Sequence, residues 1–218
     1  MRRAVNTLLV CLTVLLVCGC SGDEPAAQMT LADIVTFGGY SSGCPVFTLR
    51  KNGDSPLITL TGDAGRTLKD VEEGQRVLLR YLPQNGEAYT SGNVSVRSVV
   101  RINYDKLRKG PLDGWDADPV YMLALWRTGE YLNLECRVEY ADEARRFYLV
   151  IDEETASDPV PQLYLMHDMG DAPANFQRHI YASWDMSAIW NTEGCRGVTV
   201  HLRDSNREIN EVTFLKDE

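Results

Sequence analysis

The chain has 218 residues, of which 44% are hydrophobic and 24% are charged, and its formal net charge is −9. This acidic balance disfavours nucleic acid and anionic lipid head groups as partners, because both repel a negatively charged chain. The length exceeds that of a typical single domain and the apolar content is enough for ordinary cores, so two domains are expected.

The first segment, residues 1–19, has the composition of a secretory leader. Arg2 and Arg3 precede an apolar run that is too short to cross a bilayer comfortably. The run ends in LVCGC, which resembles a bacterial lipobox with cleavage just before Cys20. A thioether-linked diacylglycerol on Cys20 would supply the acyl chains that stable anchoring requires. We therefore predict a cleaved lipoprotein signal peptide and lipidation of Cys20.

Residues 20–30 are expected to form an acylated tether, because they are small and polar after Cys20. The first of them, SGDE, resemble the acidic tags that direct some lipoproteins of diderm bacteria to the outer face of the outer membrane. We therefore expect an outer-membrane lipoprotein that lies at the cell surface rather than at the periplasmic face. Loss of the leader leaves 20 basic against 31 acidic residues, and the acidic excess falls on residues 106–218.

Five strand-like segments lie between residues 31 and 105. Apolar and polar residues alternate within them and turn residues separate them, as is typical of β-strands. The segments are LADIVTF (31–37), PVFTLR (45–50), LITL (57–60), QRVLLRY (75–81) and NVSVRSVVRINY (93–104). The alternation in the last segment puts on one face Val94, Val96, Ser98, Val100 and Ile102. Five short strands over this length predict a small OB-like barrel.

Four arginines of these strands are interpreted as ordinary surface residues, namely Arg76, Arg80, Arg97 and Arg101. A cationic groove for single-stranded nucleic acid would use such side chains. Residues 25–105 contain eight acidic and eight basic residues, however, so the barrel is balanced in charge. No nucleic-acid partner is expected.

A charged segment with glycine and proline, residues 106–118, is expected to link the barrel to a second domain at 119–218. Seven strand-like runs follow, at 120–126, 131–140, 146–151, 162–166, 179–184, 197–202 and 211–215. This number and spacing predict an immunoglobulin-like β-sandwich, so the whole chain is expected to be all-β. Trp126 and Trp184 are expected to pack in its core, and DMSAIWN (185–191) to form one helical turn.

Five stretches carry a family resemblance: EGQRVLLRY, GEYLNLECRVEY, RRFYLVID, LYLMHDMGDAP and IYASWDMSAIW. In these the mature chain resembles the NigD-like lipoproteins, which implies an OB-like barrel, an immunoglobulin-like sandwich and a lipid anchor. The chain departs from the family at Met166, His167 and Asp168, where arginine, histidine and asparagine are more typical. The family takes its name from a bacteriocin gene cluster, so the resemblance also implies an immunity or accessory role.

Two loops contain residue types that bind ligands. His167, Asp168 and Asp171 fall in a predicted hairpin loop, where they would suit a ligand such as a metal ion or act as an acid and base pair. Asp and Gly are also typical turn residues, and an ordinary turn is the favoured interpretation. Trp115 in the linker would stack on a sugar or a partner, or pack between the domains. A weak calcium candidate consists of Asp113, Asp116 and Asp118, for which a solvated linker is the favoured interpretation. No resident metal or other cofactor is expected.

The mature chain keeps three cysteines besides Cys20, so at most one intramolecular disulfide is expected. Cys136 with Cys195 is the favoured pair, and inert buried thiols fit the pattern equally well. Cys44 would remain free.

We predict a non-catalytic, lipid-anchored protein of the cell envelope that binds a protein or glycan partner. The alternative is a bacteriocin immunity or accessory lipoprotein, which rests on the family resemblance. A weaker alternative is a hydrolase that uses His167 and Asp168. No catalytic residue is assigned, because the sequence lacks a nucleophile elbow, a phosphate-binding loop and a zinc-protease motif. The oligomeric state is left open.

Overall fold

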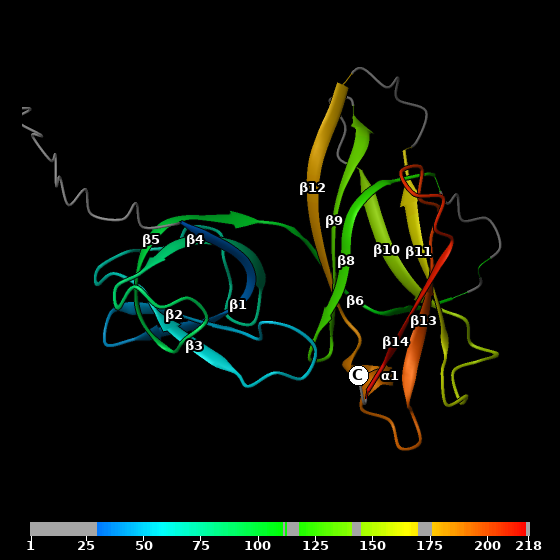
Figure 1. Ribbon diagram of the computed structural model, residues 1–218, viewed down its shortest axis with the longest axis horizontal. Helices are drawn as coiled ribbons and strands as arrows, with labels where there is room; N and C mark the ends of the chain where they lie inside the picture. Colours follow the sequence, from blue (N-terminus) through cyan, green and yellow to red (C-terminus); the bar gives the residue numbers. More distant parts are fainter. Residues whose placement is uncertain (1–29, 111, 113–117, 141–144, 170–175, 217–218) are drawn as a thin grey trace, which may run out of the picture.

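The computed structural model describes residues 30–110, 112, 118–140, 145–169 and 176–216. These residues form a closed five-stranded barrel followed by a sandwich of two sheets, with one helical turn (Figure 1). The all-β prediction and the order of the two modules are confirmed. The predicted leader and Cys20 lie outside the described residues. In the part of the chain that is described, no helix has the length and apolarity needed to cross a membrane.

The barrel contains five strands, β1 (Leu31–Ser41), β2 (Cys44–Leu49), β3 (Ile58–Thr61), β4 (Arg76–Pro83) and β5 (Gly92–Arg101). They are hydrogen-bonded in the closed order β1-β2-β3-β5-β4. Between β1 and β2, Ser42 and Gly43 have φ values of 50° and 77°, as a tight type I′ hairpin turn requires. The alternating inward side chains fill the barrel, including Val35, Phe47, Leu60, Leu79 and Val94.

The prediction that alternate residues of 93–104 share one face is correct only in the first half of this segment. The pairing of β4 with β5 shifts register between Arg80 and Tyr81, which lie opposite Ser98 and Val96. This bulge adds one residue to β5 and reverses the alternation beyond it. Val100 is therefore 48% exposed, and the neighbouring residue, Val99, packs against the barrel core instead.

The sandwich consists of a five-stranded sheet in the order β14-β13-β11-β10-β7 and a four-stranded sheet in the order β6-β12-β9-β8. Its main strands are β8 (Tyr121–Thr128), β9 (Tyr131–Tyr140), β10 (Arg146–Ile151), β11 (Gln162–Asp168), β12 (Phe176–Asp185), β13 (Gly197–His201) and β14 (Glu211–Leu215). Trp184 is buried in the core between the sheets, as predicted. Trp126 is only partly buried and lines a hollow between the two modules, so the prediction of a core position is wrong.

The chain enters the sandwich at Asn103, before the predicted boundary. Two short strands, β6 (Asn103–Lys106) and β7 (Arg108–Lys109), pair in parallel with β12 and β10 respectively. Leu107 lies between them and packs against the sandwich core. The start of the predicted linker therefore joins both sheets, because their edges offer unpaired backbone groups that a passing strand satisfies.

A single helical turn, α1 (Ser187–Trp190), follows β12 and confirms that prediction. Its residues Ile189 and Trp190 are buried and continue the sandwich core. Backbone hydrogen bonds to Met186 and Ser187 close the turn. This turn brings Trp190 and Asn191 to the side of the sandwich that faces the barrel.

Candidate functional site

Several predicted site residues lie outside the described residues, namely Trp115, Asp171, Asp113 and Asp116. Asp118 is described, and it anchors the chain to the end of β11. Its carboxylate Oδ2 accepts the backbone N–H of Met169 at 2.8 Å, and its own N–H donates to the carbonyl of His167 at 2.8 Å. Within the described ranges, no group of three or more His, Cys, Asp or Glu residues is placed to hold a metal ion.

His167 and Asp168 belong to strand β11 rather than to the predicted loop, because β10 pairs with β11 as far as Asp168. His167 is 1% exposed, and its ring stacks on Phe147 with centroids 4.6 Å apart. Its Nδ1 lies 3.3 Å from the carbonyl oxygen of Asp118. Burial lowers the pKa of His167, so the neutral imidazole is favoured. The geometry makes His167 part of the sandwich packing.

The three described cysteines, Cys44, Cys136 and Cys195, are free thiols. Cys136 is buried in the sandwich core, where burial raises the pKa of its thiol to about 12. Cys195 is also buried, and its Sγ lies 3.4 Å from the carbonyl oxygen of Gly197. The two cysteines that the sequence favoured as a pair are therefore unreactive buried thiols, which was the other open interpretation.

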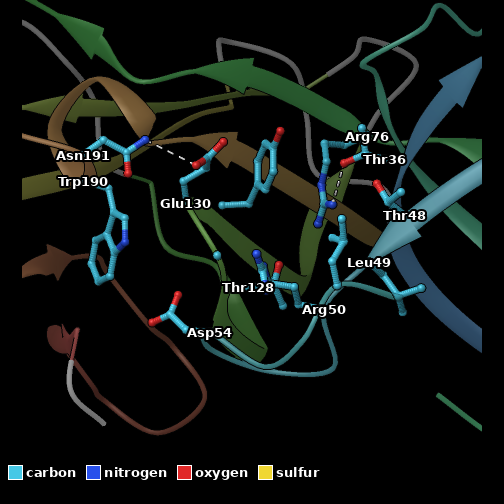
Figure 2. Close-up of a pocket in the computed structure, with 13 residues that line it drawn as sticks. Thr36, Thr48, Leu49, Arg50, Asp54, Arg76, Thr128, Glu130, Trp190 and Asn191 are labelled. Atoms are coloured by element: carbon cyan, nitrogen blue, oxygen red, sulfur yellow. Dashed lines mark hydrogen bonds between the residues drawn. The ribbon is translucent and has the colours of Figure 1, made fainter. Parts of the chain in front are cut away.

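A pocket of about 330 Å³ lies between the barrel and the sandwich. The barrel contributes side chains from β1, β2, β4 and the β2–β3 loop, and the sandwich contributes the β8–β9 turn, Tyr131 and the end of α1. Figure 2 shows that charged and hydroxyl side chains of both modules converge on it. This interdomain pocket is the candidate functional site, because small-molecule pockets typically form between domains and combine a few polar groups with apolar walls.

Arg76 is the first residue of β4 and reaches across the interface. It is 3% exposed. Its Nε donates to Ser183 Oγ at 3.2 Å and its Nη2 to Asn133 Oδ1 at 3.0 Å, both in the sandwich. Within the barrel, Nη1 donates to Thr36 Oγ1 at 3.1 Å and Nη2 to the carbonyl oxygen of Ile34 at 3.3 Å. Arg76 therefore holds the two modules in one relative orientation at the wall of the pocket.

All the described hydrogen-bond partners of Arg76 are neutral. The guanidinium carbon also lies 4.3 Å from the ring centroid of Tyr131, close enough for a cation–π interaction. Burial lowers the pKa of Arg76 to about 10, so the group is still positively charged at neutral pH. A buried charge is costly unless polar groups surround it, and here oxygen dipoles and an aromatic face take the place of a carboxylate.

The opposite wall contains an ion pair between the modules. Arg127 of β8 binds both carboxylate oxygens of Asp54, with Nη1 and Nη2 at 2.8 and 2.7 Å. Hydrogen bonding to Arg127 lowers the pKa of Asp54. The guanidinium of Arg127 also lies 4.4 Å from the ring centroid of Trp190, and the Nζ of Lys216 lies 5.4 Å from it. The ring of Trp190 is therefore buried and packs against the charged groups of Arg127 and Lys216.

Backbone hydrogen bonds join the modules beside this ion pair. The N–H of Gly53 donates to the carbonyl of Arg127 at 3.0 Å, and the N–H of Gly129 donates to the carbonyl of Gly53 at 2.7 Å. Gly53 thereby forms an isolated parallel bridge with Thr128. Main-chain bonds of this kind fix the β2–β3 loop against the sandwich, so the pocket has a defined shape.

Comparison with known proteins identifies the family. A family model described as the NigD-like C-terminal beta sandwich domain matches residues 107–215, which is half of the chain. This chain belongs to the NigD-like family. No curated protein shows significant sequence similarity to this NigD-like chain.

Solved structures share the fold of both modules. A protein named provisionally as toxin-related, from Parabacteroides distasonis, has a TM-score of 0.67 at 17% identity, covering 87% of this chain and 95% of its own. A NigD-like immunity protein from Bacteroides caccae has a TM-score of 0.62 at 16% identity, covering 84% and 91%. A protein named provisionally as a lipoprotein, from Bacteroides fragilis, has a TM-score of 0.58 at 13% identity, covering 85% and 96%.

The sequence interpretation missed the central residue of this NigD-like pocket. Arg76 was assigned to the barrel surface together with Arg80, which is indeed exposed. The available signal was the apolar run Val77, Leu78 and Leu79, because an apolar residue between two inward ones indicates that both faces of the strand are covered. Leu78 is buried on the outer face of the barrel, opposite Ile34, where the sandwich docks.

Proposed function

We propose that this NigD-like protein is a lipid-anchored, non-catalytic protein of the bacterial cell envelope that recognises a protein or glycan partner. The observation that carries the proposal is the interdomain pocket. The barrel contributes Arg50 and Arg76 to it, and the sandwich contributes Glu130. Its walls present hydrogen-bond donors and acceptors held in place by interdomain bonds, which favours recognition. The burial of His167 supports a function without catalysis, because a substrate would not reach the ring without movement of β11.

The lipobox-like sequence supports the anchor, and the naming of a solved relative as a provisional lipoprotein supports it independently. Mass spectrometry of the protein purified from membranes would test this part. We expect an N-terminal Cys20 that carries diacylglycerol, and we expect a Cys20→Ser variant to lose its membrane attachment. An unacylated mature terminus in the wild type would contradict the anchor.

The acidic residues after Cys20 support display at the cell surface. Intact cells treated with an external protease should lose the protein, whereas a periplasmic marker of the same cells should survive. Protection of both proteins from the protease would assign the molecule to the periplasmic face and would contradict surface display.

The recognition function is tested by filling the pocket without disturbing the core. Leu57 lines the pocket and is 55% exposed, so Leu57→Trp should narrow the pocket and leave the fold intact. Tyr121→Trp is the control, because Tyr121 is 37% exposed and lines neither this pocket nor the two other hollows between the modules. With full-length protein in detergent micelles on a glycan array, we expect signals that Leu57→Trp removes and the control keeps. A signal that neither variant changes would place recognition elsewhere on the molecule.

A second candidate function is immunity to a bacteriocin, which the name of the solved Bacteroides caccae relative favours. Expression of the gene in bacteriocin-sensitive cells separates the two candidates. Survival of those cells in the presence of a bacteriocin producer, with loss of survival in the Leu57→Trp variant, would favour immunity and assign it to the same pocket.

A further inference from the structure

The pocket contains a buried positive charge without a described carboxylate partner. Arg76 donates four hydrogen bonds to the neutral acceptors Ser183, Asn133, Thr36 and Ile34. A guanidinium has five N–H donors, so the contacts to described residues leave one donor on Nη1. An anion placed beside this group would gain a charge-assisted hydrogen bond, because the guanidinium is held in place by its four other bonds.

We propose that the interdomain pocket binds the carboxylate of an acidic sugar, with Arg76 as the anion-binding residue. This inference rests on the proposed recognition function and names the ligand class of the same pocket. Thr36 and Thr48 are partners in neighbouring strands of the barrel wall, and both line the pocket beside Arg76. The hydroxyl of Thr48 can donate to a second oxygen of the ligand, whereas the hydroxyl of Thr36 is hydrogen-bonded to Arg76 and Tyr131.

The acidic residues of the pocket are arranged so that they do not compete for Arg76. Both carboxylate oxygens of Asp54 are bound by Arg127, which offsets the charge of Asp54. Glu130 comes from the β8–β9 turn of the sandwich, where its Oε2 accepts a bond of 3.4 Å from the side-chain amide of Asn191. The pocket therefore has a positive end at Arg76 and acceptors at Glu130, which suits a carboxylate with neighbouring hydroxyl donors.

A sugar fits this pocket better than an apolar protein anchor. Protein interfaces concentrate their binding energy in aromatic or apolar side chains that enter desolvated pockets. Here the aromatic Trp190 is buried under Arg127 and Lys216, and the Tyr131 ring lies against Arg76. Leu49 is buried, and Leu57 supplies apolar surface at the exposed rim. The volume of about 330 Å³ is at the small end of the range of about 300–1,000 Å³ for small-molecule sites. Compact polyhydroxylated acids match these properties.

The test supplies the pocket with its own carboxylate. Thr36→Asp puts an acid where Thr36 Oγ1 now accepts from Arg76, and Thr36→Asn is the uncharged control of the same shape. Isothermal titration would use full-length protein in detergent micelles with glucuronate, galacturonate and N-acetylneuraminate, and with glucose and galactose as neutral counterparts. We expect at least one acidic sugar to bind about tenfold or more tighter than the neutral sugars, and more weakly in high salt.

The two Thr36 variants test whether acidic-sugar binding depends on Arg76. Thr36→Asn should retain acidic-sugar binding within about threefold, and Thr36→Asp should lose it while melting about 2–4 °C higher than Thr36→Asn, because Arg76 gains a partner. Equal binding of neutral and acidic sugars in the pocket would overturn this inference and leave the proposed function standing. Binding of a glutamate-containing peptide without any sugar would overturn the sugar assignment. A glycan or partner signal that Leu57→Trp leaves unchanged would place recognition outside this pocket and would overturn the inference, whereas the absence of any glycan or protein partner would overturn the proposed function itself.

Discussion

Arg76 and His167 are both buried polar residues, but the protein accommodates them in opposite ways. His167 stacks on Phe147, and burial lowers the pKa of its imidazole, which stays neutral. Arg76 remains charged at neutral pH with a pKa of about 10, so its surroundings must solvate it. An imidazole adapts to burial by losing a proton, whereas a guanidinium cannot. A buried arginine therefore indicates a polar environment built around it, and a buried histidine does not.

The largest expected difference is in stability. Arg76→Ala should lower the free energy of unfolding by about 2–3 kcal/mol, because it removes donors from several buried acceptors at the interface. Arg80→Ala on the same strand is the control and should change it by less than about 0.5 kcal/mol, because Arg80 is exposed. Urea denaturation followed by tryptophan fluorescence measures both. Equal effects would show that the interface does not depend on Arg76.

Replacement of the histidine should cost less. His167→Leu keeps a buried side chain of similar size and removes one long contact of 3.3 Å to the carbonyl of Asp118. We expect a loss of about 1 kcal/mol in the same urea experiment. A loss as large as that of Arg76→Ala would contradict the contrast drawn between the two residues.

Protonation of His167 makes the free energy of unfolding depend on pH near neutrality, whereas Arg76 stays charged in this range. The unfolded chain binds a proton at His167 below about pH 6.5, and the folded chain does so only at a lower pH. Stability is therefore retained above pH 6.5 and is lost as the pH falls toward the lowered folded pKa, by at most about 1.4 kcal/mol per pH unit. The difference between wild type and His167→Leu, measured from pH 7.5 to 5, should shrink on acidification. His179 and His201 are present in both proteins and cancel.

The smallest effect is expected at the ion pair between Asp54 of the barrel and Arg127 of the sandwich. Asp54→Asn should destabilise the protein by less than about 1 kcal/mol, because the Asp54 side chain is 54% exposed and solvent screens its charge. The effect should decrease further in 1 M salt. A loss of stability as large as that of Arg76→Ala in the same urea experiment would mean that the Asp54–Arg127 ion pair contributes as much to the interface as Arg76 does.

Much of the fold was predictable because its signals are local. The alternation of buried and more exposed residues over 134–139 in β9 and 162–165 in β11 depends only on neighbours along the strand, as does the helical turn at Ser187–Trp190. The error at Val100 arose because a bulge is a property of two paired strands, and the partner that creates it is not adjacent in sequence. The extension of β11 through His167 was missed for the same reason, since β10 supplies the pairing.

The sequence by itself determined the all-β class, the order of barrel and sandwich, and most strand positions, because side-chain periodicity encodes which face of each strand is buried. Only the tertiary structure decided which polar residues matter. Arg76 and Arg80 lie on the same face of β4 in the alternating pattern. Arg76 is nevertheless buried against Asn133 and Ser183, whereas Arg80 faces solvent. That difference is set by where the sandwich docks on the barrel, which involves residues more than 50 positions away.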